Sequence, residues 1–246
     1  MTWLTWRQFR VQAFVAIGLL ALLAIYVIIT GPHISHVFNA FARRCSPGQT
    51  CNPLGNSKLA AVTKLIPELG DLVSLTPALI GMFWGAPLVA REIESGAIRL
   101  VFTQSISRAQ WLRSKILVVG LASVLVTGLT SLMVTWWART WDHYNYLPFG
   151  TFNTRDIAPI AYGAFTFALG VFIGLLLRRT IPAMATTLVL YIAVNAAFGQ
   201  YVRPHLPGFD VDSRYWTVQW TESLIYLAMA LALGYCSIWW IRRHYG

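Results

Sequence analysis

Six windows of roughly 20 apolar residues recur along the chain, separated by polar segments. They cover residues 12–30, 72–90, 115–137, 157–177, 181–199 and 222–241, and none has Asp, Glu, Lys or Arg through its middle. A hydrocarbon core of ~30 Å is crossed by about 20 residues of helix. The apolar runs are continuous rather than alternating, which favours helices over strands. The pattern therefore predicts an all-α polytopic membrane protein, with one transmembrane domain of six helices over residues 1–246.

The first window follows Arg7 and Arg10, an arrangement that a secretory signal peptide also has. Its apolar core is longer than that of a signal peptide, lacks a small-residue cleavage site and ends in Gly31-Pro32. We therefore expect an uncleaved first span, followed by a long loop over residues 31–71. The fourth and fifth windows are separated only by "RRT", which predicts a tight helical hairpin at residues 178–179.

Composition supports the membrane assignment, because 57% of the residues are hydrophobic and only 11% are charged. The charge distribution orients the chain. With six spans, both termini lie on one side together with the segment 91–115 and the hairpin, and this side holds 11 of the 19 Lys and Arg residues but only two of the nine acidic ones. The positive-inside rule then puts both termini in the cytoplasm. Topology and anionic headgroups explain the net charge of +10, so no nucleic-acid partner is predicted.

The predicted external loop contains two cysteines, Cys45 and Cys51, in a Pro/Gly-rich stretch. An external compartment is oxidising, so a local disulfide is one expectation, and two unpaired thiols are the alternative. His33 and His36 have a spacing that suits a shared metal, but no third ligand is near them, and we predict no metal site.

Chemistry inside the predicted spans is sparse. Asp71, Asp156 and Glu222 all lie near external ends, so coupling to an ion gradient is disfavoured. The chain has no phosphate-binding loop of the GxxxxGK type and no convergent catalytic set, so we expect no ATP hydrolysis and no enzyme activity in this chain.

The densest cluster of charges lies between the second and third windows, in a segment that we call the elbow (residues 91–115). Its sequence with the flanking residues is "LVAREIESGAIRLVFTQSISRAQWLRSKIL". Taken as a helix, residues 88–104 have an imperfect apolar stripe that Gly96 weakens, and Ser107 is a suitable N-cap for the next helix. The elbow is therefore predicted to be a short cytoplasmic helical turn joined rigidly to both spans.

The elbow sequence also carries a family resemblance. Arg-Glu-x-Glu-x-Gly at residues 91–96, followed by Thr103-Gln104, Ser107-Arg108 and Lys115, resembles membrane subunits of ATP-binding-cassette exporters of the type 2 class, especially permeases common in actinobacteria. The resemblance implies that the elbow contains a coupling helix, which fits into a groove on the ATPase subunit. Within it we assign Glu92 and Glu94 to contacts with basic groups of the ATPase. Docking or headgroup contact is assigned to three arginines of the elbow, Arg91, Arg99 and Arg108. Gly96 is a further predicted site residue.

The N-terminal stretch "TWLTWRQFR" is similar to the amphipathic interfacial helix of the same family. Trp3, Trp6 and Phe9 are expected to face lipid. Arg7 and Arg10 are expected to face headgroups or the ATPase.

By this resemblance, the working unit contains two permease protomers, expected to be a homodimer, and two ATPase subunits that bind ATP and Mg. This chain itself is expected to hold no cofactor, to contact membrane lipids and to lie in the bacterial cytoplasmic membrane. The expected function is export of a hydrophobic or amphipathic solute such as a drug, peptide or lipid. The alternatives are a non-transporting sensory or resistance module that binds a ligand, a metabolic membrane enzyme and, for the elbow alone, a solvated loop that only sets topology.

Overall fold

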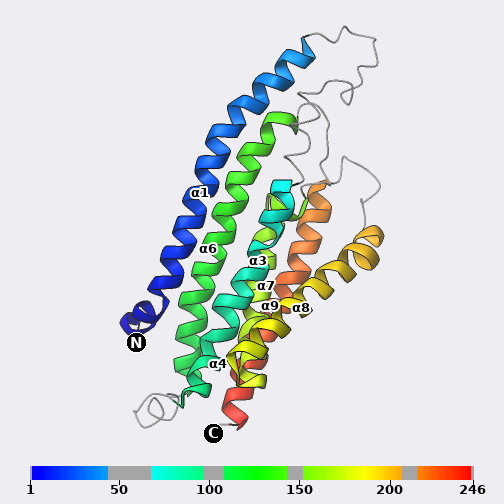
Figure 1. The fold of residues 1–246 in the computed structure, drawn as a ribbon. Helices are drawn as coiled ribbons and strands as arrows, with labels where there is room; N and C mark the ends of the chain where they lie inside the picture. The colour runs from blue at the N-terminus through cyan, green and yellow to red at the C-terminus, as the bar shows by residue number, and fades with distance from the viewer. Residues whose placement is uncertain (1, 44–67, 97–107, 143–151, 207–214, 245–246) are drawn as a thin grey trace.

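The structure is a computed structural model that describes residues 2–43, 68–96, 108–142, 152–206 and 215–244. In these ranges the chain is helical, without strands. The long helices, shown in Figure 1, are α1 (Thr2–Ala42), α6 (Arg108–Asp142), α7 (Ala158–Leu177), α8 (Thr180–Ala197) and α9 (Tyr215–His244). The remaining elements are a helix over 68–74, α3 (Thr76–Ile80), α4 (Ala86–Glu94), the π-helical turns η2 (Gly81–Gly85) and η4 (Phe198–Val202), and the 3-10 turns η3 (Phe152–Thr154) and η5 (Arg203–His205).

Within the described residues, six helical stretches are long and apolar enough to cross a membrane, which confirms the predicted all-α fold with six spans. They are Arg10–Ala40, Glu68–Glu94, Ala109–Arg139, Ala158–Leu177, Thr180–His205 and Tyr215–Arg243. Most extend beyond the apolar windows because the helices continue into polar residues at their ends. The second stretch is continuous through Pro77 and Pro87, and η2 separates α3 from α4 within it.

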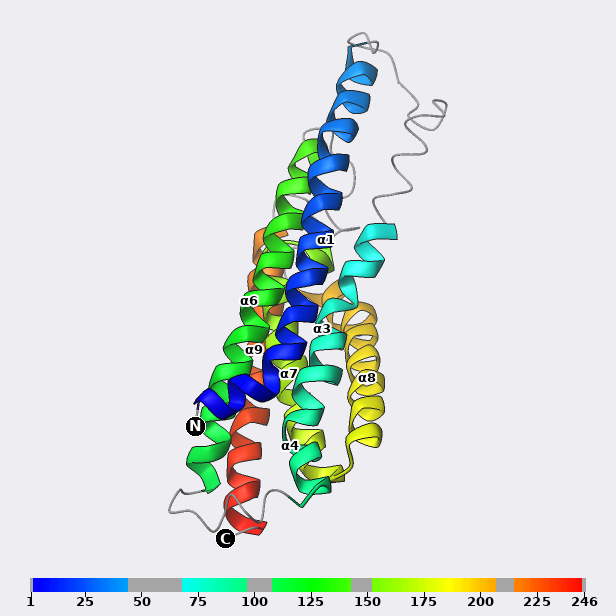
Figure 2. The same cartoon turned by 60° about the vertical axis from the view of Figure 1, so that its left-hand side comes forward.

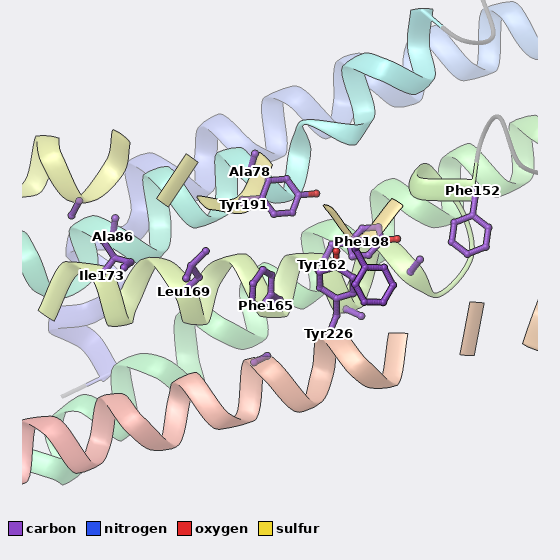
Figure 3. Close-up of a cluster of buried hydrophobic side chains, with 14 of the residues drawn as sticks. Ala78, Ala86, Phe152, Tyr162, Phe165, Leu169, Ile173, Tyr191, Phe198 and Tyr226 are labelled. Carbon is purple, nitrogen blue, oxygen red and sulfur yellow. The ribbon is translucent and has the colours of Figure 1, made fainter. Parts of the chain in front are cut away.

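Helix α7 lies at the centre of the bundle and packs against α3, η2, α4, α6, α8 and α9. Of its most hydrophobic window, 67% is buried, compared with 6% for α1, which packs mainly along α6 (Figure 2). Aromatic rings fill the contact between α7 and α9. Tyr226 packs edge-on against Tyr162 and Phe165, with ring centroids 4.7 and 5.3 Å apart (Figure 3). The core of the protein is therefore built around α7.

Glycines bring the second span into backbone contact with α7. Gly81 and Gly85 are four residues apart in η2, and Gly170 and Gly174 are four apart in α7. A Cβ added to Gly85 would lie 2.6 Å from the carbonyl oxygen of Phe167, and one added to Gly81 would lie 2.6 Å from that of Thr166. Such pairs of small residues allow transmembrane helices to approach closely and associate through van der Waals contact.

The first span does not end at Gly31-Pro32 as expected, because α1 continues to Ala42. Residues 31–42 of the predicted loop are therefore helical. Packing against α6 carries the helix past the proline: Ile34 and Phe38 are buried against α6, and Trp137 donates a hydrogen bond to the Thr30 hydroxyl at 3.0 Å. In Figure 1, the distal parts of α1 and α6 project beyond the other helices.

Four segments that are far apart in the sequence meet at one end of the bundle. Helix α1 begins there and α9 ends there (Figure 1), and the turn from α7 to α8 and the end of α4 lie at the same end. We call it the elbow end. The first turns of α1 lie at an angle to the rest of that helix in Figure 2.

Candidate functional site

The first half of the elbow is a helix end with a left-handed glycine. Helix α4 ends at Glu94, and Gly96 has a φ of +72°. The amide of Ser95 donates to the Arg91 carbonyl at 3.0 Å, and that of Gly96 donates to the Ile93 carbonyl at 3.1 Å. Glycine in the left-handed region at this place is a common helix terminator. The expected helix over 88–104 therefore stops near its middle, and its residues 97–104 lie outside the described part of the chain.

The second half of the elbow is the start of α6, which begins at Arg108, directly after the predicted N-cap Ser107. Ser107 itself lies outside the described residues. Leu112 and Trp111 are buried against α9 and α4 in one apolar cluster. Lys115 is also buried, and its ammonium group lies 4.6 Å from the centre of the Trp111 ring.

An ion pair joins the two halves of the elbow. The Lys115 ammonium group contacts Glu92 Oε1, and the two side chains are only 6% and 13% exposed. The other carboxylate oxygen of Glu92 is buried and has no hydrogen-bond partner among the described residues. This enclosure does not fit the expectation that Glu92 reaches outward to the ATPase. Lys115, from the facing helix, draws the carboxylate inward because a buried charge needs a partner.

The second carboxylate of the elbow, Glu94, connects α4 to α8. Its Oε2 accepts a hydrogen bond from the Thr180 backbone amide at 2.8 Å. Thr180 is the first residue of α8, where backbone amides lack partners within the helix and the helix dipole favours a negative charge. Glu94 therefore caps α8 from another span.

The structure describes only some of the other predicted site residues. Arg91 and Gly96 are exposed at the elbow end, as is Arg10 in α1. Arg108 begins α6, and Trp3, Trp6, Arg7 and Phe9 belong to the first turns of α1, but the side chains of these five are outside the described part. Arg99, Cys45 and Cys51 also lie outside it, so the disulfide, the interfacial helix contacts and the role of Arg99 remain predictions.

The elbow end has a basic surface. The exposed arginines that gather there are Arg10, Arg91, Arg113, Arg178, Arg179, Arg242 and Arg243. Of the two acidic residues at this end, Glu92 is enclosed with Lys115 and Glu94 caps α8. The surface therefore presents positive charge to anionic headgroups or to an acidic partner.

A buried polar cluster lies at the opposite end of the bundle. Glu222 of α9 is fully buried, and Arg203 of η5 donates to both of its carboxylate oxygens, at 2.7 and 3.0 Å. Tyr162 of α7 donates to the same carboxylate. Arg203 also donates to Asn153 Oδ1 at 2.7 Å, and its guanidinium lies 4.5 Å from the centre of the Phe152 ring. These contacts tie the turn after α8 to α7 and α9.

A second polar group continues from this cluster along α9. The Tyr215 hydroxyl donates to Asp156 at 2.7 Å and accepts from Arg155 at 3.2 Å, and Gln219 donates to the same hydroxyl at 2.9 Å. The side-chain oxygen of Gln219, Oε1, accepts a hydrogen bond at 2.9 Å from the backbone amide of Ala158, the first residue of α7. The starts of α7 and α9 are therefore held together by polar contacts rather than by apolar packing alone.

Sequence reasoning placed Glu222 near the external end of a span but missed its burial and its pairing with Arg203. A signal was present, since Glu222 is the single acid within α9 and Arg203 follows the previous span on the same side. Pairing of the two would have been a reasonable inference from the cost of an isolated buried charge.

The two ends of the bundle thus differ in chemistry. The elbow end has an exposed basic surface, and its two carboxylates contact neighbouring helices. The opposite end contains buried polar side chains that are hydrogen-bonded to one another. Within the described ranges, no cluster of three or more His, Cys, Asp and Glu side chains is placed to hold a metal ion. At the elbow end, side-chain contacts join α4 to α6 and to α8.

Comparison with known proteins agrees with this geometry. The family described as ABC-2 membrane transporter related matches residues 17–203, which include the second to fourth spans, most of the first and fifth, and the elbow. No curated protein and no solved structure matches the chain. The family match covers most of the chain, so this protein belongs to the ABC-2 membrane transporter related family and is a permease-type component of a membrane.

Proposed function

We propose that the chain is the membrane-spanning permease subunit of an ATP-binding-cassette exporter, driven by ATP that a separate ATPase subunit hydrolyses. The observation that carries the proposal is the fastening of the elbow, in which Glu92 pairs with Lys115 and Glu94 caps α8. A solvated loop that only sets topology has no need of contacts that join α4 to two other helices, α6 and α8.

The contacts of the elbow form a route by which a displacement of α4 is passed to other helices. A force on the end of α4 acts on α6 through Glu92–Lys115 and on α8 through Glu94–Thr180. It also reaches the central helix, because η2 contacts α7 backbone to backbone at Gly81 and Gly85. ATP binding to the partner would thereby shift the spans between two arrangements, as a coupled transporter requires.

We assign the contact with the ATPase to the exposed residues of the elbow. Arg91 and Gly96 are exposed, and Glu94 is exposed as well as capping α8. Arg99 and Arg108 keep their proposed docking role. Glu92 becomes an internal brace rather than a docking group. The amphipathic start of α1 lies at the same end, where it lines the membrane surface beside the ATPase.

The proposed assembly contains two permease protomers, two ATPase subunits and bound ATP with Mg on the ATPase. Five spans packed around the central span α7 leave little space for a substrate path inside one protomer. A homodimer in the bacterial plasma membrane, with the path between protomers, accounts for this. Both termini are then cytoplasmic, as the basic elbow end favours. We propose a hydrophobic or amphipathic solute, because many large apolar side chains are exposed on the helix faces between which such a path would run.

The proposal is tested by charge reversal at an exposed elbow position. The tagged chain is co-expressed with a candidate ATPase subunit, and the retained ATPase and its ATP hydrolysis in liposomes are measured. We expect Arg91→Glu to lower the retained ATPase roughly five-fold, the equivalent of about 1 kcal/mol. The matched control is Arg139→Glu, an exposed arginine near the far end of α6.

Equal retention by both variants would remove the elbow from the interface. No retention by the unaltered chain would favour the alternative, a non-transporting module that binds a ligand.

A further inference from the structure

An apolar groove runs along the bundle between α6 and α9, with α7 as its floor. Its volume is about 390 Å³. Small residues form much of the lining, namely Gly120, Ala164, Ala168, Ala230 and Gly234. Leu231 and Tyr235 on α9 are 68% and 71% exposed and form an open side. The groove therefore opens on the surface that faces the membrane rather than into the protein.

The length of the groove corresponds to one leaflet. Along α6 it runs from Ile116 to Val124, which at 1.5 Å per residue is about 12 Å. Along α9 it runs from Leu227 to Ile238, about 16 Å. Half of the hydrocarbon core of a bilayer is ~15 Å. A groove of this length accommodates a single extended acyl chain of one leaflet.

Two arginines lie at one mouth of the groove, at the elbow end. Arg113 is three residues before Ile116, on the same face of α6, and Arg242 is four residues after Ile238 on α9. The two helices pack together here, because Leu112, Ile238 and Ile241 share one apolar cluster. Both arginines are exposed, and neither forms an ion pair with a carboxylate among the described residues. The mouth is therefore positively charged and the groove behind it is apolar.

We propose that this groove is a binding site for an anionic glycerophospholipid of the leaflet at the elbow end. One acyl chain lies in the groove and the phosphate group lies between Arg113 and Arg242. Guanidinium groups bind phosphate through paired hydrogen bonds, and an arginine near anionic lipid is worth ~1 kcal/mol. The proposal depends on the chain spanning a membrane and is independent of the ATPase partner and of the exported solute.

The site is tested by native mass spectrometry of the full-length chain, delipidated in detergent. Phosphatidylglycerol and phosphatidylcholine with identical acyl chains are titrated separately. We expect the unaltered chain to prefer phosphatidylglycerol, by about five-fold for each arginine. Arg113→Gln with Arg242→Gln should abolish the preference. Arg243→Gln is the matched control, since Arg243 is adjacent, exposed and stacked over Trp239 rather than at the groove, and it should leave the preference unchanged.

A second variant fills the groove itself. No atom lies within 4 Å of a Cβ added at Gly234, so Gly234→Leu fits without backbone strain and occupies the space of the acyl chain. It should weaken the binding of both lipids, whereas Gly18→Leu, at an equally open position on α1, should not.

Three results would overturn the site: no lipid preference in the unaltered chain, a preference that survives loss of both arginines, or unchanged lipid binding in Gly234→Leu. If Gly234→Leu instead dissociates a dimer and leaves lipid binding unchanged, the groove is an interface between two copies of the chain. The arginine variants keep the test valid if the leucine variant does not fold, because they alter exposed side chains only.

Discussion

Glu92 of α4 pairs with Lys115 of α6 and so joins the two ends of the elbow across residues that are 23 positions apart. Both side chains are nearly enclosed, and the second carboxylate oxygen of Glu92 has no hydrogen-bond partner among the described residues. The pair therefore fixes the spacing between the second and third spans at the elbow end.

Loss of one member of this pair leaves the other charge buried alone. We expect Glu92→Leu or Lys115→Met to lower the free energy of unfolding by about 3–5 kcal/mol. The double variant should recover most of this loss, because an apolar pair needs no partner. Denaturant titration of the purified chain, followed by tryptophan fluorescence, measures the three values. Additive losses in the double variant would show that the two residues do not act as a pair.

Glu94 is expected to hold the first turn of α8 locally. Glu94→Ala removes the acceptor of the Thr180 amide, so that amide should exchange its hydrogen faster than in the unaltered chain. Glu94→Gln keeps a carbonyl acceptor without the charge and should give an intermediate rate. Hydrogen exchange of the backbone amides in α9 serves as the internal reference. Unchanged exchange in the first turn of α8 for the alanine variant would contradict the capping role.

The backbone contact between the second span and α7 predicts a steric effect. A Cβ at Gly174 would lie 2.5 Å from the Ala86 carbonyl oxygen, so Gly174→Val must push the two helices apart. We expect a loss of about 1–3 kcal/mol or more in unfolding free energy. Gly18→Val is the control, because no atom lies within 4 Å of its added Cβ. Similar thermal midpoints for the two variants would show that the helices separate at little cost.

In the buried cluster at the opposite end, the contribution of charge to stability can be measured separately from that of hydrogen-bond geometry. Glu222→Ala leaves Arg203 without its carboxylate and should cost about 3–5 kcal/mol. Arg203→Lys keeps the charge but loses the forked pair of hydrogen bonds, so about 1–3 kcal/mol is expected. Unfolding of both variants in detergent gives the comparison. An equal loss for the two would mean that the fork, and not the charge, provides the stabilisation.

The spans were predictable from sequence, because a bilayer requires about 20 apolar residues of helix from each crossing segment. The grouping of the termini, elbow and hairpin at one end follows from an even number of spans. The continuation of α1 through Pro32 was not predictable, since it depends on Trp137 and neighbouring residues of α6. Proline is normally a sign of a helix end, and only tertiary packing overrides it here.

The polar contacts were the least predictable part of the site. Charged residues between two spans are usually solvated, so Glu92 was expected to face outward. The position of Lys115 one turn after Trp111 placed an ammonium group inside an apolar cluster, and that burial demanded an anion. Helix faces alone do not reveal such a pairing, because it depends on how α4 and α6 meet.

The glycine contact between η2 and α7 has a mechanical consequence. Because the backbones lie close together at Gly85 and Phe167, with no side chain between them to change rotamer, we expect the second span and α7 to move as one rigid body. Spin labels placed on these two helices should report a constant separation throughout a transport cycle. Any stroke that opens a path through the membrane must then come from helices that move against this pair, such as α1 together with α6, which pack along each other.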